Sequence, residues 1–344
     1  MFKDINDRAL RWRDDLRVFL KMPRSINGKT VLVVGGGGFI GSNVARKFSS
    51  AGFDVRVAGR SLQPLHPIGD SKYFQIDLLG ARPDLGIFDD VQIIIHSATT
   101  TIPSTSMRDM AYDHNSNCSI ALRLLEIAAA RNIETFLFIS SGGTVYGIPK
   151  RLPVREDHPT DPISSYGITK LSIEKYVHLY GLDSIARAVS LRVANPYGQE
   201  QLMGTPVGAL ANFTLRALMD EKIHIWGNGS IVRDYIDVSD LANAVLAAVA
   251  IPSGAYNIGS GQGHSLNDLI EIVAKFKGRA LDVTYESSRS IDVPNIVLDT
   301  SKFAAAANWS AEISLIEGAK KLWDFAQGQH LRNRAKIVPG RRKT

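Results

Sequence analysis

Apolar residues of this chain come in short runs that alternate with helix-like stretches. Short runs rich in Val, Ile and Phe predict buried strands, and apolar residues recurring every three or four positions predict amphipathic helices. The predicted strands are Val31–Val34, Asp54–Ala58, Tyr73–Ile76, Val91–Ser97, Thr135–Ser140 and Ala188–Val193, and the predicted helices are Ser42–Ser50, Asn117–Arg131 and Tyr166–Tyr180. Strands that alternate with helices in this way predict an α/β fold, a doubly wound parallel sheet of the Rossmann type.

A glycine-rich turn follows the first apolar run. Residues 31–41 read VLVVGGGGFIG, with glycines at Gly35, Gly38 and Gly41, and a helix-like stretch begins at once. A strand that turns through glycines into a helix lets backbone N–H groups approach a pyrophosphate. Without further context such a turn can be purely structural. Together with the next motif, it predicts a bound dinucleotide.

The second motif is SSYGITK at residues 164–170, which places Tyr166 and Lys170 on one face of a predicted helix. A phenol with a pKa of about 10 is a poor base at neutral pH. A nearby positive charge favours the phenolate, so a lysine one turn away suits an acid/base tyrosine. Read alone, the pair would be an ordinary surface Tyr and Lys.

The pattern changes after Asn195, where glycine- and proline-rich turns occur near 196–208, 227–229 and 259–263. This irregular part predicts a smaller substrate-binding region over the carboxyl edge of the sheet, where open α/β folds bind ligands. Phe2–Leu20 predicts an amphipathic helix that packs on the body or on a partner subunit. The expected divisions are an N-terminal helical extension (1–28), a dinucleotide-binding Rossmann domain (29–195), a mainly substrate-binding region with segments returning to the Rossmann domain (196–328) and a basic tail (329–344).

Composition narrows the class of protein. The chain has 344 residues, of which 44% are hydrophobic and 22% charged, as in an ordinary globular enzyme. Its single cysteine, Cys118, excludes an intramolecular disulfide and a thiolate metal cluster, so we expect a small buried apolar group and no metal. No stretch approaches the roughly 20 apolar residues that span a bilayer, and the charged start lacks the apolar core of a signal peptide. We expect a cytoplasmic protein without a membrane span.

The net charge of +6 is local, because part of it lies in the C-terminal sequence RNRAKIVPGRRKT. A basic tail can contact nucleic acid or an anionic membrane, but a solvated tail is the simpler interpretation. We therefore expect no nucleic-acid partner.

Longer motifs carry a resemblance to a known family. They are VVGGGGFIGS, FQIDLLG, IIHSA, SSGGTVYG, YGITK, LRVANPYG, IWGNGSIVRDYIDVSDLANAV, YNIGSG and SRSIDVPNIVLDTSK, and they extend from Thr30 to Phe325. The chain resembles an extended short-chain dehydrogenase/reductase, and within that group the nucleotide-sugar epimerase/dehydratase family that includes UDP-glucose 4-epimerase. The resemblance implies that Tyr166 moves a proton on a sugar hydroxyl while hydride passes to or from a nicotinamide, with Lys170 beside it.

The resemblance also implies binding residues. Those for the cofactor are Gly35, Gly38, Phe39, Ile40, Gly41, Arg60, Asp77, Leu78, Ser97, Asn117, Tyr166 and Lys170, and those for the diphosphate of a nucleoside diphosphate sugar are Asn195, Arg233 and Arg289. Asp77 would accept from the adenine amino group, and Asn117 would tie its helix to the sheet. Guanidinium groups suit phosphate oxygens, although Arg233 could instead pair with Asp234 or Asp237. His96 is expected to pack near the cofactor rather than to act as an acid or base.

The chain departs from the family pattern at two places. Gly142 stands where the family has a catalytic Ser or Thr, so Thr144 and Ser141 are the candidate replacements, Thr144 slightly ahead. Gly59 and Arg60 stand where relatives that use NAD carry an acidic residue for the ribose 2′-hydroxyl. Arg60 could pair with a 2′-phosphate. The family resemblance therefore predicts NAD as the cofactor, whereas Gly59 and Arg60 favour NADP.

Several functions remain open at this stage. The run from SSGGTVYG to RDYIDVSDLANAV most resembles nucleotide-sugar 4-epimerases, whereas Arg60 favours an NADPH-dependent 4-keto nucleotide-sugar reductase. A dehydratase is less favoured because GGT offers no carboxylate. The missing hydroxyl at Gly142 keeps a non-catalytic NAD(P)-binding subunit open. The family commonly forms homodimers through the helices at 117–131 and 166–180.

Overall fold

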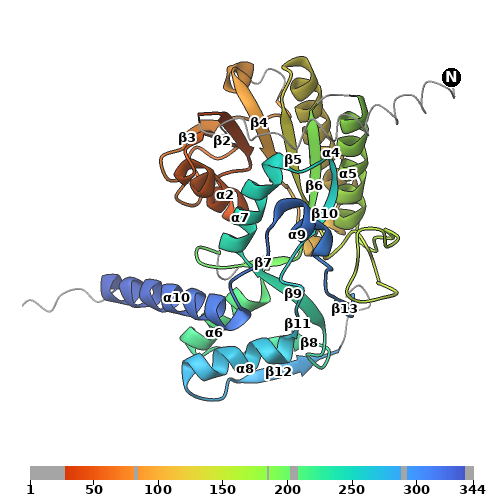
Figure 1. Cartoon of the computed structure of the whole chain (residues 1–344). Coiled ribbons are helices and arrows are strands. Elements are labelled where there is room, and N and C mark those ends of the chain that lie inside the picture. Colours follow the sequence, from red (N-terminus) through yellow and green to blue (C-terminus); the bar gives the residue numbers. More distant parts are fainter. Residues whose placement is uncertain (1–27, 81–83, 184–185, 202–207, 288–292, 338–344) are drawn as a thin grey trace, which may run out of the picture.

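The computed structural model describes residues 28–80, 84–183, 186–201, 208–287 and 293–337 (Figure 1). The expected N-terminal helix at Phe2–Leu20, the candidate ligand Arg289 and the end of the basic tail lie outside these residues.

One parallel sheet forms the upper part of the molecule in Figure 1. Its strands are β1 (Thr30–Val34), β2 (Asp54–Gly59), β3 (Lys72–Gln75), β4 (Val91–His96), β5 (Thr135–Ser141), β6 (Arg187–Val193) and β10 (Gly254–Ile258). Their spatial order is β10-β6-β5-β4-β1-β2-β3, and every neighbouring pair is parallel. The Rossmann-type fold is confirmed, and each of the six predicted strands is present.

The sheet is covered on both faces, which explains the continuous apolar runs. Along β1, Val31 and Val33 belong to one core with helices α2 (Phe39–Ser50) and α7 (Val238–Ala247). Leu32 and Val34 belong to the opposite core, with α4 (Met110–Ala130) and α5 (Ser165–Asp183). Because side chains alternate along a strand, neighbouring residues fill opposite cores.

Helix α4 begins earlier than expected. The sequence predicts a start at Asn117, but the helix begins at Met110, and the Asp109 side chain caps it by accepting from the N–H of Tyr112 at 2.8 Å. The first two turns lack an apolar stripe because their inward-facing residues Asp113, Ser116 and Asn117 are buried in polar contacts. The short helices η1 (Leu85–Phe88) and α3 (Pro103–Ser106) precede it.

The chain after Asn195 is more regular than expected. Strands β7 (Asn195–Tyr197), β9 (Val232–Asp237), β11 (Gly263–Ser265) and β13 (Asn295–Ile296) form a small sheet, and β8 (Ile223–Trp226) pairs with β12 (Val283–Glu286). Helices α6 (Ala209–Met219), α8 (Leu266–Lys277) and α10 (Leu315–Ile337) enclose a third apolar core with this region. Helix α10 continues past residue 328, so the expected start of the basic tail falls within a helix.

Parts of this downstream chain return to the main sheet. Strand β10 pairs with β6, α7 packs against α2, and η2 (Ala248–Ala250) and α9 (Ser301–Ala307) contact β5 and β10 respectively. The upper and lower parts in Figure 1 are thus joined by several crossings of the chain.

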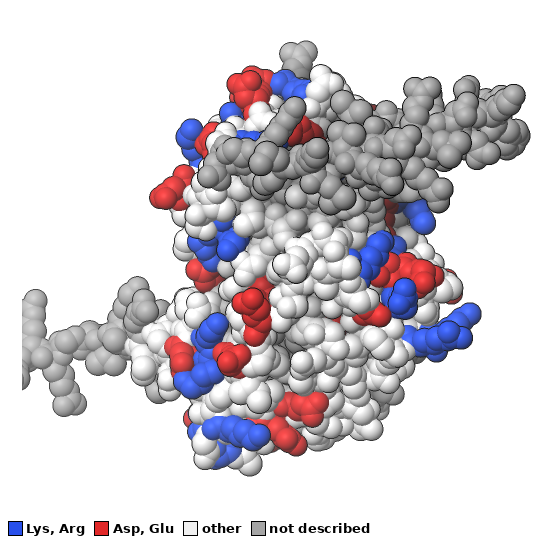
Figure 2. Space-filling view, in the orientation of Figure 1, with Lys and Arg blue, Asp and Glu red and all other residues white. Residues whose placement is uncertain are grey.

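Two surface properties bear on partners. On the face drawn in Figure 2, basic and acidic side chains are interspersed. Within the described residues, no helix has the length and apolar character needed to cross a membrane.

Candidate active site

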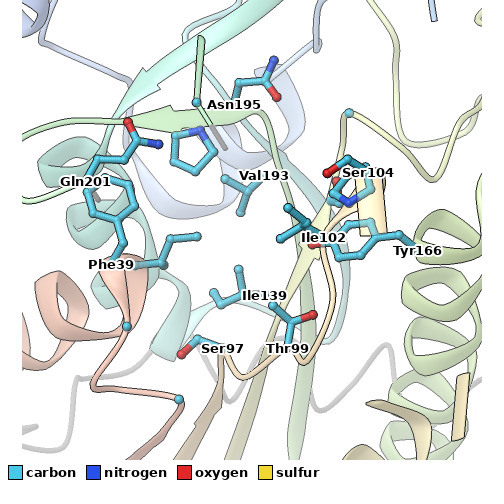
Figure 3. Close-up of a pocket in the computed structure, with 18 of the residues that line it drawn as sticks. Phe39, Ser97, Thr99, Ile102, Ser104, Ile139, Tyr166, Val193, Asn195 and Gln201 are labelled. Carbon is cyan, nitrogen blue, oxygen red and sulfur yellow. The ribbon is translucent and has the colours of Figure 1, made fainter. Parts of the chain in front are cut away.

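A cavity of about 1230 Å³ lies between the carboxyl ends of the main sheet and the region after Asn195. Its wall extends from the glycine-rich turn through Tyr166 to Arg233. Pockets for one drug-sized molecule measure roughly 300–1,000 Å³, so this cavity suits a dinucleotide with a second ligand. Figure 3 shows Phe39 and Gln201 on one side of the cavity, Tyr166 on the other, and Ser97 and Ile139 at its base.

The glycine-rich turn fits a pyrophosphate. Gly35 has φ +81°, and a Cβ there would lie 2.6 Å from the backbone of Ala98, while a Cβ at Gly41 would lie 2.4 Å from the Gly35 carbonyl oxygen. Helix α2 begins after Gly38 without a side-chain cap and without an acidic residue in its first turn. Its first N–H groups, including those of Phe39 and Ile40, are therefore available to an anion.

Residues beside β2 and β3 form the far end of the cavity, where Arg60, Asp77 and Leu78 contribute to the wall. A Cβ at Gly59 would lie 2.6 Å from the Tyr73 hydroxyl oxygen, and that hydroxyl donates to the Ser61 carbonyl at 2.7 Å. The Tyr73 ring therefore occupies the space that a side chain at position 59 would need. The side chain of Arg60 is exposed at this end.

Two further residues expected near the cofactor differ in position. Ser97 lines the cavity and donates to the Val34 carbonyl at 2.9 Å. Asn117 is absent from the described wall; its amide oxygen accepts from the N–H of Thr100 at 2.9 Å, and Thr100 is part of the wall. Asn117 thus positions the wall segment at Thr100 and does not itself line the cavity.

Helix α5 carries both Tyr166 and Lys170 to the cavity wall. The ammonium of Lys170 is buried, donates to the Ile139 carbonyl at 2.9 Å and lies 5.5 Å from the centre of the Tyr166 ring. Burial lowers the pKa of Lys170 to about 8, against the opposing effect of Glu174 and Asp113.

The surroundings of Tyr166 favour its protonated phenol at neutral pH. Burial raises its pKa well above the ordinary value, and the nearby carboxylate of Asp113 raises it further. Burial and Asp113 therefore outweigh any effect of the Lys170 ammonium on this pKa. A positive charge brought into the cavity would favour the phenolate.

The hydroxyls near the end of β5 are those of Ser141 and Thr144, which both line the cavity. The Thr144 hydroxyl oxygen is buried without a hydrogen-bond partner among the described residues, so it is available to a ligand. At Gly142 a Cβ would lie 2.5 Å from Leu298 Cδ1 and 2.9 Å from the Arg192 carbonyl oxygen. A Ser or Thr side chain at position 142, as in the family, would therefore require Leu298 and the backbone at Arg192 to shift.

At the opposite end, Asn195 and Arg233 line the cavity. Arg233 lies on β9, and its guanidinium donates to the carbonyls of Val232 at 2.9 Å and Pro294 at 3.3 Å. Of the two acids considered as its partners, Asp234 accepts from Ser260 at 2.7 Å and Asp237 caps α7 through the N–H of Ser239 at 2.8 Å.

The remaining candidates are buried away from the wall. His96 is 1% exposed, stacks on Phe138 with ring centres 5.4 Å apart, and has its pKa lowered to about 3 by burial and by Lys170. The Cys118 thiol is buried, which raises its pKa to about 11. Among the described residues, no cluster of His, Cys, Asp and Glu could hold a metal ion.

Sequence reasoning missed two residues. Gln201 is buried and lines the cavity, and its amide oxygen is unpartnered among the described residues. Nothing in its surrounding sequence distinguishes it. Asp113 is fully buried beside Tyr166, and its position one helical turn before Asn117 could have indicated an inward-facing carboxylate.

Comparisons with known proteins agree with this geometry. Residues 31–259 match the model of the NAD dependent epimerase/dehydratase family. The chain is 34% identical, over 87% of its length and 99% of the relative's, to a Methanocaldococcus jannaschii protein provisionally named UDP-glucose 4-epimerase. It is 28% identical, over 85% of its length and 96% of the relative's, to the dTDP-4-dehydro-6-deoxyglucose reductase of Escherichia coli. The crystal structure of UDP-glucose 4-epimerase from Thermotoga maritima with UDP-glucose superposes with a TM-score of 0.81, at 30% identity over 88% of this chain and 99% of that one.

Proposed function

The chain belongs to the NAD dependent epimerase/dehydratase family, and from this premise we propose that it is a nucleotide-sugar 4-epimerase. The observation that carries the proposal is one cavity whose wall includes the glycine-rich turn, the Tyr166–Lys170 pair and Arg233. Likeness to a structure that holds UDP-glucose supports a nucleoside diphosphate sugar as the substrate. Residues 29–195 would supply most of the cofactor site, and residues 196–328 most of the substrate site.

In this mechanism Tyr166 is the acid/base. When bound, an oxidised nicotinamide supplies the hydride acceptor and a positive charge. Tyr166 as phenolate takes the proton from the sugar C4 hydroxyl and returns it after the sugar has presented its other face. Lys170 holds its ammonium against the Ile139 carbonyl and near the Tyr166 ring, so it orients the pair and contributes positive charge. Thr144 or Ser141 would hydrogen-bond the sugar oxygen.

Charged and amide groups at the far end would bind the nucleoside diphosphate. We assign Arg233, Asn195 and Arg289 to this role, of which Arg233 and Asn195 line the cavity. A guanidinium fork suits phosphate oxygens because its N–H groups can donate in parallel.

The preference for NAD or NADP depends on the end of β2. The family is NAD dependent by description. Gly59 leaves no carboxylate to repel a 2′-phosphate, and the exposed Arg60 beside the cavity could pair with one. These two residues support NADP for this chain.

A 4-keto nucleotide-sugar reductase is the second candidate, because Arg60 suits an exchangeable NADPH. Its support also includes the similarity to a bacterial 4-dehydro-sugar reductase. An epimerase restores its cofactor in each cycle, whereas a reductase consumes it. Mass spectrometry of the nicotinamide that copurifies separates the two: tightly retained NAD supports the epimerase, and NADPH that exchanges during turnover supports the reductase.

The proposal includes a homodimer through α4 and α5, which pack against each other. Apolar side chains are exposed on α5, with Ile168 51%, Leu179 54% and Leu182 60% exposed. Such exposed apolar residues favour a protein partner. Light scattering of the Leu179→Asp variant should report a monomer if this face is the dimer contact, with exposed Leu331→Asp on α10 as the control.

The decisive experiment replaces Tyr166 by Phe and assays turnover of UDP-glucose and UDP-galactose with bound cofactor. We expect the rate to fall by roughly 10²–10⁴, the usual contribution of a positioned acid/base. Cofactor binding should remain. Wild-type protein that binds cofactor but converts no nucleotide sugar would instead support a non-catalytic subunit.

A further inference from the structure

Asp113 is a buried acid that the proposed mechanism does not use. Its side chain has no exposed surface, and no ion pair to it occurs among the described residues. A buried carboxylate is costly unless other groups satisfy it, so its partners need an explanation.

Four side-chain donors satisfy Asp113, two on each oxygen. Oδ1 accepts from the Thr101 hydroxyl and from the Asn117 amide at 3.1 Å. Oδ2 accepts from the hydroxyl of Ser165 at 2.6 Å and from that of Thr169 at 3.0 Å. All four partners are neutral, so the hydrogen bonds support the carboxylate without cancelling its charge.

The partners belong to the parts of the chain that carry the site. Ser165 directly precedes Tyr166, and Thr169 directly precedes Lys170. Thr101 continues the segment Thr99–Thr100 of the cavity wall. We infer that Asp113 is a positioning residue: it joins the 99–101 segment, α4 and the start of α5, and it places a buried negative charge beside the Tyr166–Lys170 pair.

The charge has opposite effects on the two members of the pair. A carboxylate disfavours a neighbouring phenolate and favours a neighbouring ammonium. In agreement, Asp113 adds to the burial that raises the pKa of Tyr166, and it opposes the burial that lowers the pKa of Lys170. Asp113 thus adds to the burial that keeps the phenol protonated, and a cation that enters the cavity would act against both effects, which couples the base to cofactor binding.

Other titratable groups are packed around this cluster. They are Lys170 and Glu174 on α5, Cys118 on α4, His96 at the end of β4 and Arg192 on β6. His114, which contacts Cys118, is exposed. Glu174 is paired with Arg192 at 2.8 Å, and burial keeps His96 neutral and the Cys118 thiol protonated near pH 7. Of the two buried acids in this cluster, Glu174 is thus paired with a cation, whereas Asp113 has no ion pair among the described residues and its charge acts on Tyr166.

This inference rests on the proposed role of Tyr166, but its test needs no turnover. Protein labelled with ¹³C at the tyrosine ring carbon that bears the hydroxyl is saturated with NAD⁺ and titrated by NMR, with the Tyr166 signal assigned from Tyr166→Phe. Asp113→Asn should lower the pH midpoint of Tyr166 by about one unit or more, because a like charge beside it is removed. Failure of the protein to convert any sugar would count against the proposed function and leave this reading unaffected.

Asp109→Asn is the matched control, because it removes the same charge from an exposed position of the same helix and Asn still caps it. Its midpoint should equal that of the wild type. Equal midpoints for Asp113→Asn and Asp109→Asn, or a midpoint raised by Asp113→Asn, would overturn the inference.

A second variant covers the case in which Asp113→Asn does not fold. Ser165→Ala with Thr169→Val keeps Asp113 and removes both donors on Oδ2. A buried carboxylate that loses these donors binds its own proton more readily, so its effect on the phenol weakens and the Tyr166 midpoint should fall. An unchanged or raised midpoint in this variant would contradict the role assigned to Asp113.

Discussion

The main-sheet region and the region after Asn195 contribute to the same cavity in different ways. In the first, Ser97 follows β4, Ser141 ends β5 and Tyr166 lies in the first turn of α5, which packs on the seven-stranded sheet. In the second, Arg233 lies on β9, whose neighbours β11 and β13 are three and two residues long. The residues that we propose for the chemical step thus lie on the more extensive framework, and the residue that we propose for binding the diphosphate lies on the smaller one. Substitutions should therefore cost most in the first region.

The largest effect is expected for Lys170→Met. The substitution keeps an unbranched side chain in a buried position and removes the ammonium near Tyr166. We expect turnover to fall by roughly 10²–10⁴, with the fold preserved by circular dichroism. An active Lys170→Met enzyme would contradict the role that we propose for the main-sheet region in the chemical step.

A smaller effect is expected for Arg233→Ala in the second region. Loss of a charged hydrogen bond to the diphosphate should weaken nucleotide-sugar binding by about 1.5–3 kcal/mol, measured by calorimetry with UDP-glucose. Arg279→Ala is a control in the same region, because Arg279 is ion-paired with Asp220 outside the cavity wall. Equal affinity for both variants would remove Arg233 from the site.

A third prediction examines the joint between the regions, where Leu298 packs on Gly142. Gly142→Ser should destabilise the protein by about 1–3 kcal/mol through overpacking. Leu298→Ala relieves one of its two close contacts, so the double variant should lose less stability than the sum of the single variants. Urea denaturation measures the free energy of unfolding of each variant. Strictly additive losses of stability would show that Leu298 does not limit the side chain at position 142.

The smallest effect is expected for Arg60→Ala, because the side chain is exposed. The affinity for NADP should fall roughly fivefold, corresponding to ~1 kcal/mol for an exposed charge pair, while the affinity for NAD changes less. Lys72→Ala on the neighbouring strand is the control for general loss of positive charge. Equal losses for both nucleotides would reject the contact with a 2′-phosphate.

The sequence predicted six of the seven strands of the main sheet, because most of them are buried and contain few polar residues, as in Val31–Val34 and Val91–His96. It missed β10 (Gly254–Ile258), which follows the irregular part of the chain. It missed the start of α4, where buried Asp113 and Asn117 interrupt the apolar pattern. The helices after Asn195 were also missed, since the turns around them dominate the local pattern. At the site, spacing identified Tyr166 and Lys170, but only the fold brings Leu298 against Gly142.

The return of β10 to the main sheet has a consequence for dividing this chain. Strand β6 is hydrogen-bonded on one side to β5 and on the other to β10, which comes from more than fifty residues downstream. A fragment ending at Asn195 would leave β6 as an open edge, ready to pair with another molecule. We therefore expect such a fragment to aggregate during expression, and the nucleotide-binding half to fold only together with the downstream strand β10.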